Sequence, residues 1–111
     1  MHNQLKFFRD TEIPSLFNKM ESFMLNEHVS GKSISIEHAG DQIIALLGYE
    51  PGNDAKLNYK LSLHNLKTTL ADSDEATQNA INAVADLLGN FICQSVVAIE
   101  GELSIAFLTG K

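Results

Sequence analysis

The feature that most constrains the fold is a stripe of apolar side chains near the start of the chain. Large apolar residues recur three and four positions apart, at Ile13, Leu16, Phe17, Met20, Phe23 and Met24. This spacing places them on one face of an amphipathic helix, and Pro14 suits its first turn, where a missing N–H breaks no helical hydrogen bond. We expect the helix to end before Ser30-Gly31. Its apolar face has to be buried, so the rest of the chain must supply a layer that covers it.

Three strand patterns follow this helix. Residues 33–37 and 55–64 alternate between polar and apolar side chains, which is typical of strands with one buried face. Residues 42–49 are apolar at nearly every position, which fits either a strand covered on both faces or a two-turn helix capped by Asp41. We favour the strand because Gly40-Asp41 suits a hairpin turn.

A second helix and two strands complete the pattern. The segment Asp72-Ser73-Asp74-Glu75 offers a capping side chain and early acidic residues, and apolar residues then recur with helical spacing up to Gly89-Asn90. Residues 91–99 and 102–108 predict two strands that are joined tightly through Glu100-Gly101-Glu102. The predicted order of elements is therefore α-β-β-β-α-β-β.

These elements predict a single α+β domain that spans residues 1–111. A chain of 111 residues with 44% hydrophobic residues is too apolar to be disordered and too short for two separate cores. No internal repeat is visible in the residues. We expect a mainly antiparallel five-stranded sheet with both helices on one of its faces.

The opposite face of this sheet carries more apolar side chains than a solvated face needs. The residues that we expect there are Ile44, Leu46, Ile92, Val96, Ala98, Ala106 and Leu108. An exposed apolar patch of more than a few hundred Å² usually marks an interaction site, so the pattern predicts a homodimer or a groove for a protein segment. The alternative is that the sheet curls, or that the segment with Leu5, Phe7 and Phe8 folds across this face.

The negative charge is concentrated towards the C-terminus. The formal net charge is −6, from 8 Lys and Arg residues against 14 Asp and Glu residues. Residues 68–111 hold one base, Lys111, and the acids Asp72, Asp74, Glu75, Asp86, Glu100 and Glu102. This distribution fits either a solvated acidic face or a docking surface for a basic partner, as in an inhibitor or immunity-type protein.

The same charge argues against nucleic-acid binding, because an acidic domain does not readily replace the counterions of a phosphate backbone. The order α-β-β-β-α also matches double-stranded-RNA-binding domains, but those contact phosphates through Lys and Arg at the start of the second helix. The corresponding position here is Asp72-Ser73-Asp74-Glu75.

The chain shows no pattern of catalytic or metal-binding residues. His2, His28, His38 and His64 lack the spacing of a metal site, and neither a nucleophile elbow nor a phosphate-binding glycine loop occurs. We therefore expect no enzyme activity, no cofactor and no metal. A third hypothesis remains open, a small-ligand binder or enzyme with a pocket lined by residues such as Tyr49, Tyr59, His38 or His64.

The expected location is the cytoplasm. The single cysteine, Cys93, excludes an internal disulfide framework. Residues 1–10 lack the apolar run of a secretory signal, and no stretch is long and apolar enough to span a membrane.

The order of elements and the hydrophobic pattern resemble those of class I type III secretion chaperones. The local likeness is best in the helix at 79–88 and in the segments Val96-Val97-Ala98-Ile99 and Leu103-Ser104-Ile105, joined by Glu100-Gly101-Glu102. This resemblance implies a small cytoplasmic homodimer that holds a protein segment extended along apolar surface. The family continues into a third helix after the last strand, whereas this sequence stops at Lys111.

Overall fold

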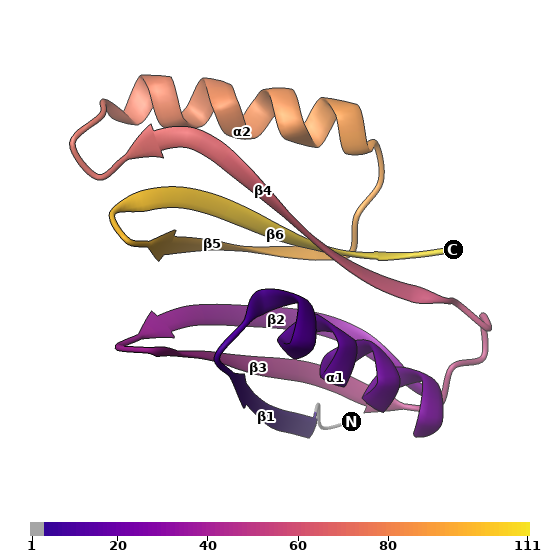
Figure 1. The fold of residues 1–111 in the computed structure, drawn as a ribbon. Coiled ribbons are helices and arrows are strands. Elements are labelled where there is room, and N and C mark those ends of the chain that lie inside the picture. The colour runs from indigo at the N-terminus through magenta and orange to yellow at the C-terminus, as the bar shows by residue number, and fades with distance from the viewer. Residues whose placement is uncertain (1–3) are drawn as a thin grey trace.

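A computed structural model describes residues 4–111 and has an α+β fold of two helices and six strands (Figure 1). The elements are β1 (Gln4–Asp10), α1 (Ile13–Asn26), β2 (Val29–Ala39), β3 (Gln42–Pro51), β4 (Tyr59–Thr69), α2 (Asp74–Leu88), β5 (Cys93–Ile99) and β6 (Glu102–Gly110). The α+β class is confirmed, whereas the single five-stranded sheet is wrong. The strands form two antiparallel three-stranded sheets, with strand orders β1-β3-β2 and β4-β6-β5.

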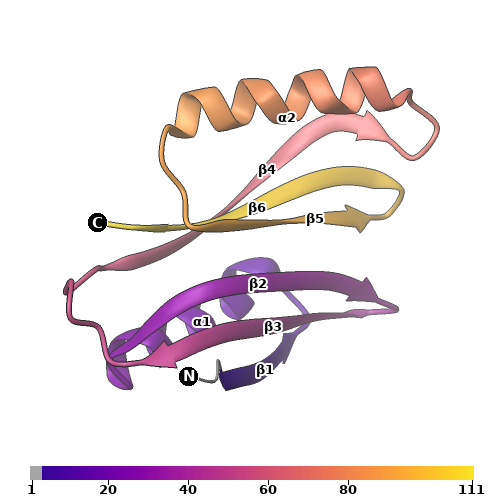
Figure 2. The same cartoon turned by 180° about the vertical axis from the view of Figure 1, so that it is seen from behind.

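The two sheets belong to two halves of the chain that share one topology. Residues 4–51, the first half, and residues 59–110, the second half, each run strand-helix-strand-strand. In each half the last strand pairs between the other two. Figures 1 and 2 show the halves stacked above one another, each with its own helix. The repeat is therefore one of topology, although the residues themselves show none.

The N-terminal segment forms β1, a strand that the sequence analysis did not predict. It pairs with β3, with Phe7 opposite Leu46, and thus extends the first sheet sideways. The alternative in which this segment covers the open sheet face is wrong for that reason. The sequence does not predict this strand, because its large side chains point to both sides: Phe8 is buried, while Leu5 and Phe7 are exposed.

Asp10 makes the turn from β1 into α1. Its carboxylate accepts hydrogen bonds from the backbone N–H groups of Thr11 and Glu12, at 2.7 and 3.2 Å. It also forms an ion pair of 3.0 Å with Lys19 on α1. The hydrogen bond from Lys19 and those from the two backbone groups lower the pKa of Asp10 from its ordinary value.

Of two further expectations, one changes in detail and one is confirmed. Helix α1 ends at Asn26, and His28 takes a left-handed backbone conformation with φ 52°, so Ser30-Gly31 lies inside β2 rather than in a stop signal. Residues 42–49 form a strand, as favoured, within β3.

The two halves meet where β2 lies beside β5. The strands are not joined by a backbone ladder. Instead, the backbone N–H of Ile36 donates to the Ser95 hydroxyl at 3.0 Å, and that of Ile34 donates to the Cys93 sulfur. Burial raises the pKa of the Cys93 thiol to about 11, although the hydrogen bond from Ile34 opposes this effect. Two side chains of β5 therefore bind backbone N–H groups of β2, at Ile34 and Ile36, that a neighbouring strand would otherwise bind.

The main core lies between the halves and is built around α1. Four α1 residues are buried, namely Leu16, Phe17, Met20 and Met24. They belong to one cluster with residues of the first sheet and with Leu61, Ala106 and Leu108 of the second. The second cluster is much smaller and joins Leu66, Ile105 and Phe107 to one side of α2.

Candidate functional site

The structure separates the seven residues that the sequence suggested for an interface. Ala106 and Leu108 have no exposed surface and belong to the core. Ile44 and Leu46 lie on the outward face of the first sheet, in register with Arg9 and Phe7. Ile92 lies against Gly110, near Leu57 and Tyr59. Val96 and Ala98 lie on the outward face of the second sheet, opposite Ile105 and Leu103.

The turn between β5 and β6 explains why Ala106 and Leu108 fall on the other face. Only Glu100 and Gly101 separate the paired residues Ile99 and Glu102, and both take positive φ values, 53° and 83°. A two-residue hairpin pairs even-numbered with odd-numbered positions, so Val96 shares a face with Ile105 and not with Ala106.

Helix α2 is the least covered element of the second half. None of its fifteen residues, all within the described part of the chain, is buried. Its packed side consists of Ala80, Ile81, Val84 and Leu88, and these are only partly buried. Leu87 is 90% exposed, more than any other large hydrophobic residue among residues 4–111.

The helical spacing of α2 gives a second, exposed apolar side. Ala76, Ala83 and Leu87 are exposed and follow one another at intervals of seven and four residues, with Ala80 between them. The acidic residues Glu75 and Asp86 lie on a different side of the helix. We call Ala76, Ala83 and Leu87 the α2 surface.

The outward face of the second sheet is the one on which α2 packs, and part of this face is not covered by the helix. Val96 is 49% exposed, and Ala98 and Gln94 on the same face are exposed as well. Phe91 packs against Phe107, with ring centroids 4.7 Å apart, but remains partly exposed. Helix α2 therefore covers this sheet only in part.

The acidic residues suggested for docking are all exposed, and five of the six gather at one end of the second half. They are Asp72, Asp74, Glu75, Glu100 and Glu102, while Asp86 lies near the other end of α2. The turn before α2 meets the β5–β6 turn through the backbone hydrogen bond from Leu70 to Gly101, at 3.4 Å. Both turns lie at the left-hand end of the upper half in Figure 1.

Some of these acidic residues also stabilise the neighbouring turns through hydrogen bonds. The Asp72 carboxylate accepts hydrogen bonds from the backbone N–H and hydroxyl of Thr69. Glu102 accepts one from the Asn65 side chain. The cap of α2 is the hydroxyl of Ser73, which accepts from the backbone N–H of Ala76 at 3.2 Å.

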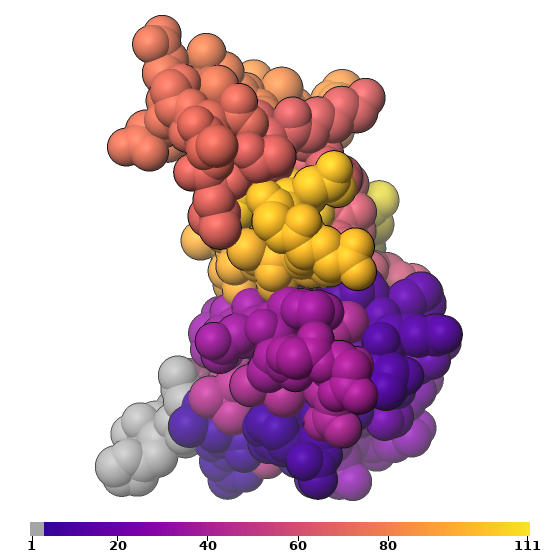
Figure 3. All heavy atoms as spheres, turned by 60° about the vertical axis from the view of Figure 1, so that its left-hand side comes forward, coloured from indigo at the N-terminus to yellow at the C-terminus, as the bar shows by residue number. Residues whose placement is uncertain are grey.

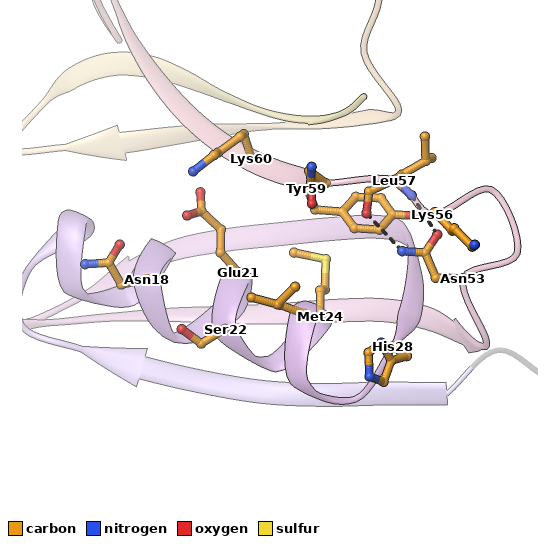
Figure 4. Close-up of a pocket in the computed structure, with 12 residues that line it drawn as sticks. Asn18, Glu21, Ser22, Met24, His28, Asn53, Lys56, Leu57, Tyr59 and Lys60 are labelled. Atoms are coloured by element: carbon orange, nitrogen blue, oxygen red, sulfur yellow. Dashed lines mark hydrogen bonds between the residues drawn. The ribbon is translucent and has the colours of Figure 1, made fainter.

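A cavity of about 780 Å³ lies between α1 and the segment that leads into β4 (Figure 4). Of the four residues that the sequence suggested for a ligand pocket, it includes Tyr59 alone. His64 is instead bound to Ser62 and packs edge-on to Phe107. His28 lines the cavity and was not singled out for it. Its other polar residues, such as Asn18 and Asn53, come from distant segments, so no local motif signals the cavity.

The described residues show no preformed metal site. Among residues 4–111, no group of three or more His, Cys, Asp and Glu side chains is placed to hold an ion. His2, which the sequence analysis considered, lies outside the described residues. Neither helix of residues 4–111 is long and apolar enough to cross a membrane.

Comparisons with known proteins add no relative to this picture. The resemblance to class I type III secretion chaperones stays a prediction. No family model, curated protein or solved structure was found to match the chain.

Proposed function

We propose that the protein is a non-enzymatic protein-interaction module that forms a homodimer through the α2 surface. The observation that carries this proposal is the burial of α2: its amphipathic sequence is typical of a packed helix, yet none of its described residues is buried. Small side chains at Ala76, Ala80 and Ala83 would allow a second helix to approach closely. Two-fold pairing of identical surfaces is the most common form of oligomer.

The size of the exposed surface supports the proposal that the protein has a binding partner. The chain exposes 6920 Å², whereas a compact monomer of this mass exposes about 6,100 Å². The surface is thus larger than that of an average compact monomer of this mass. The radius of gyration of 14.3 Å also exceeds the value of about 13 Å expected for a compact domain of this length.

Sedimentation equilibrium tests this proposal. The wild type is expected to have the mass of a dimer, and Leu87→Asp the mass of a monomer with an unchanged circular dichroism spectrum. Leu25→Asp is the matched control, because Leu25 is also an exposed leucine on a helix, but lies on α1, away from the α2 surface. It should leave the dimer intact.

Two further variants separate this surface from the sheet faces that the sequence suggested. Val96→Asp changes the open face of the second sheet, and Ile44→Asp changes the first sheet. Both should remain dimeric. If either is monomeric while Leu87→Asp is dimeric, the interface lies on a sheet face and the α2 proposal is wrong.

A second candidate function is docking on a basic partner through the acidic end of the second half. The specific observation in its favour is that Asp72, Asp74 and Glu75 come together with Glu100 and Glu102 across the Leu70–Gly101 hydrogen bond. An octalysine peptide is a suitable probe in an amide NMR titration. This function predicts shifts confined to these two turns and an affinity that falls steeply with salt. Shifts spread over acidic residues of both halves would contradict it.

A further inference from the structure

The edge of β4 that is not paired with β6 begins at the cavity beside α1, which Tyr59 and Lys60 line, and continues past α1 at Leu61 and Leu63. Asn58 exchanges two backbone hydrogen bonds with Lys111, at 2.8 and 3.2 Å. In an antiparallel pair the bonding direction alternates, so Tyr59, Leu61 and Leu63 turn their N–H and C=O groups away from β6. This edge thus offers main-chain donors and acceptors to another strand.

One of these groups is already bound in a way that imitates a neighbouring strand. The Leu61 N–H donates to the Glu21 carboxylate at 2.7 Å. Glu21 projects from α1 towards β4 in Figure 4. The backbone groups of Tyr59 have no hydrogen-bond partner on this edge among residues 4–111. A side-chain oxygen therefore occupies the place that the carbonyl of an added strand would take.

The chemistry of the cavity lining selects the occupant. Met24, Leu25 and Leu57 provide apolar surface, while Lys56 and Lys60 add positive charge to a molecule with a net charge of −6. Glu21 is the single acidic residue among those that line the cavity. A segment with alternating apolar and acidic side chains would match both properties.

We propose that an extended segment of another protein, with acidic side chains between apolar ones, adds to β4 at Tyr59–Leu63. Its main-chain carbonyl replaces Glu21 as the acceptor for the Leu61 N–H. Its acidic side chains lie near Lys56 and Lys60. This site involves the α1 side of the second sheet and is independent of the α2 surface.

An amide NMR titration with the peptide acetyl-Glu-Val-Glu-Val-Glu-Val-amide tests the proposal. The expected shifts are at the backbone amides of Tyr59, Leu61 and Leu63. Lys60→Glu should weaken binding roughly two- to fivefold, the scale of one exposed charge pair, whereas the control Lys67→Glu on the same strand should not. Glu21→Gln keeps an acceptor oxygen but removes the negative charge, so it should tighten binding by a similar factor.

Three outcomes would overturn the proposal. The first is equal binding of a peptide that is N-methylated at all six residues, because such a peptide has no N–H group to donate on either strand edge. The second is no binding at millimolar peptide. The third is a concentration-dependent shift of Tyr59 and Leu61 without peptide, which would assign the edge to a second copy of the chain. None of these results bears on the sedimentation masses of the wild type and Leu87→Asp, so the two proposals fail separately.

Discussion

The two halves of the molecule have the same topology but very different burial. Helix α1 lies between its own sheet and the beginning of β4, and it buries four large side chains. Helix α2 contacts only the second sheet and buries none of its described residues. Figure 3 shows the second half above the first, with the orange residues at the end away from the first half. Topology therefore fixes where a helix lies, whereas its stability depends on how many layers cover it.

The largest expected difference between the halves is the cost of removing a leucine from each helix. Leu16→Ala removes a fully buried side chain of α1 and should lower the free energy of unfolding by about 2–5 kcal/mol. Leu87→Ala on α2 should cost less than about 0.5 kcal/mol under conditions where the protein is monomeric. Urea denaturation at low protein concentration measures both. Equal costs would contradict the difference in burial.

The contact between the halves depends on a glycine. A Cβ atom at Gly31 on β2 would lie 2.8 Å from Leu108 of β6 and 3.0 Å from the sulfur of Met24. Gly31→Ala should therefore cost about 1–3 kcal/mol through overpacking. Ser35→Ala, at an exposed position of the same strand, is the control. An unchanged denaturation midpoint for Gly31→Ala would show that the halves are less tightly packed than described.

The reactivity of Cys93 tests the same contact between the halves chemically. Because burial raises the pKa of Cys93 to about 11, its thiolate should be scarce at pH 8. Alkylation by iodoacetamide should be roughly 100-fold slower than in the unfolded chain, as the two-unit difference from the ordinary value of 9.0 implies. Similar rates before and after unfolding would mean that β2 and β5 separate readily.

The smallest expected effect concerns the turn that positions α1. Because the pKa of Asp10 is lowered in the folded state, its carboxylate stabilises the protein above the ordinary value of 3.8. That contribution is lost as the pH falls through the folded-state pKa. Asp10→Asn should therefore melt at a lower temperature than the wild type at neutral pH, and the gap should close in acid. Asp54→Asn, in the loop before β4, is the control. A gap that does not change with pH would contradict this role.

The sequence predicted the helices and most strands because hydrophobic periodicity reports which side of an element is covered. It did not predict the arrangement of the strands in sheets, because that arrangement depends on contacts between residues distant in the chain. The partition into two sheets depends on β2 meeting β5 through Ser95 and Cys93, and no local pattern encodes that contact.

The residues of the candidate site were also hard to predict from local patterns, except for the face on which Ala106 and Leu108 lie. Alternation along the strand alone places Ala106 and Leu108 on the open face, because it does not include the register of the hairpin. The two-residue turn at Glu100-Gly101 contains the information needed to correct it. The exposure of Leu87 could not be predicted, because its spacing is equally consistent with a buried helix.

Intermolecular NOEs test the central claim most directly, namely that the exposed side of α2 lies between two copies. The sample mixes methyl-labelled and unlabelled protein. We predict NOEs that link Leu87 of one copy to Ala76 and Ala83 of the other, as in an antiparallel helix pair. A dimer whose intermolecular NOEs come instead from Leu46 or Val96, or a protein that gives none because it is monomeric, would contradict the account.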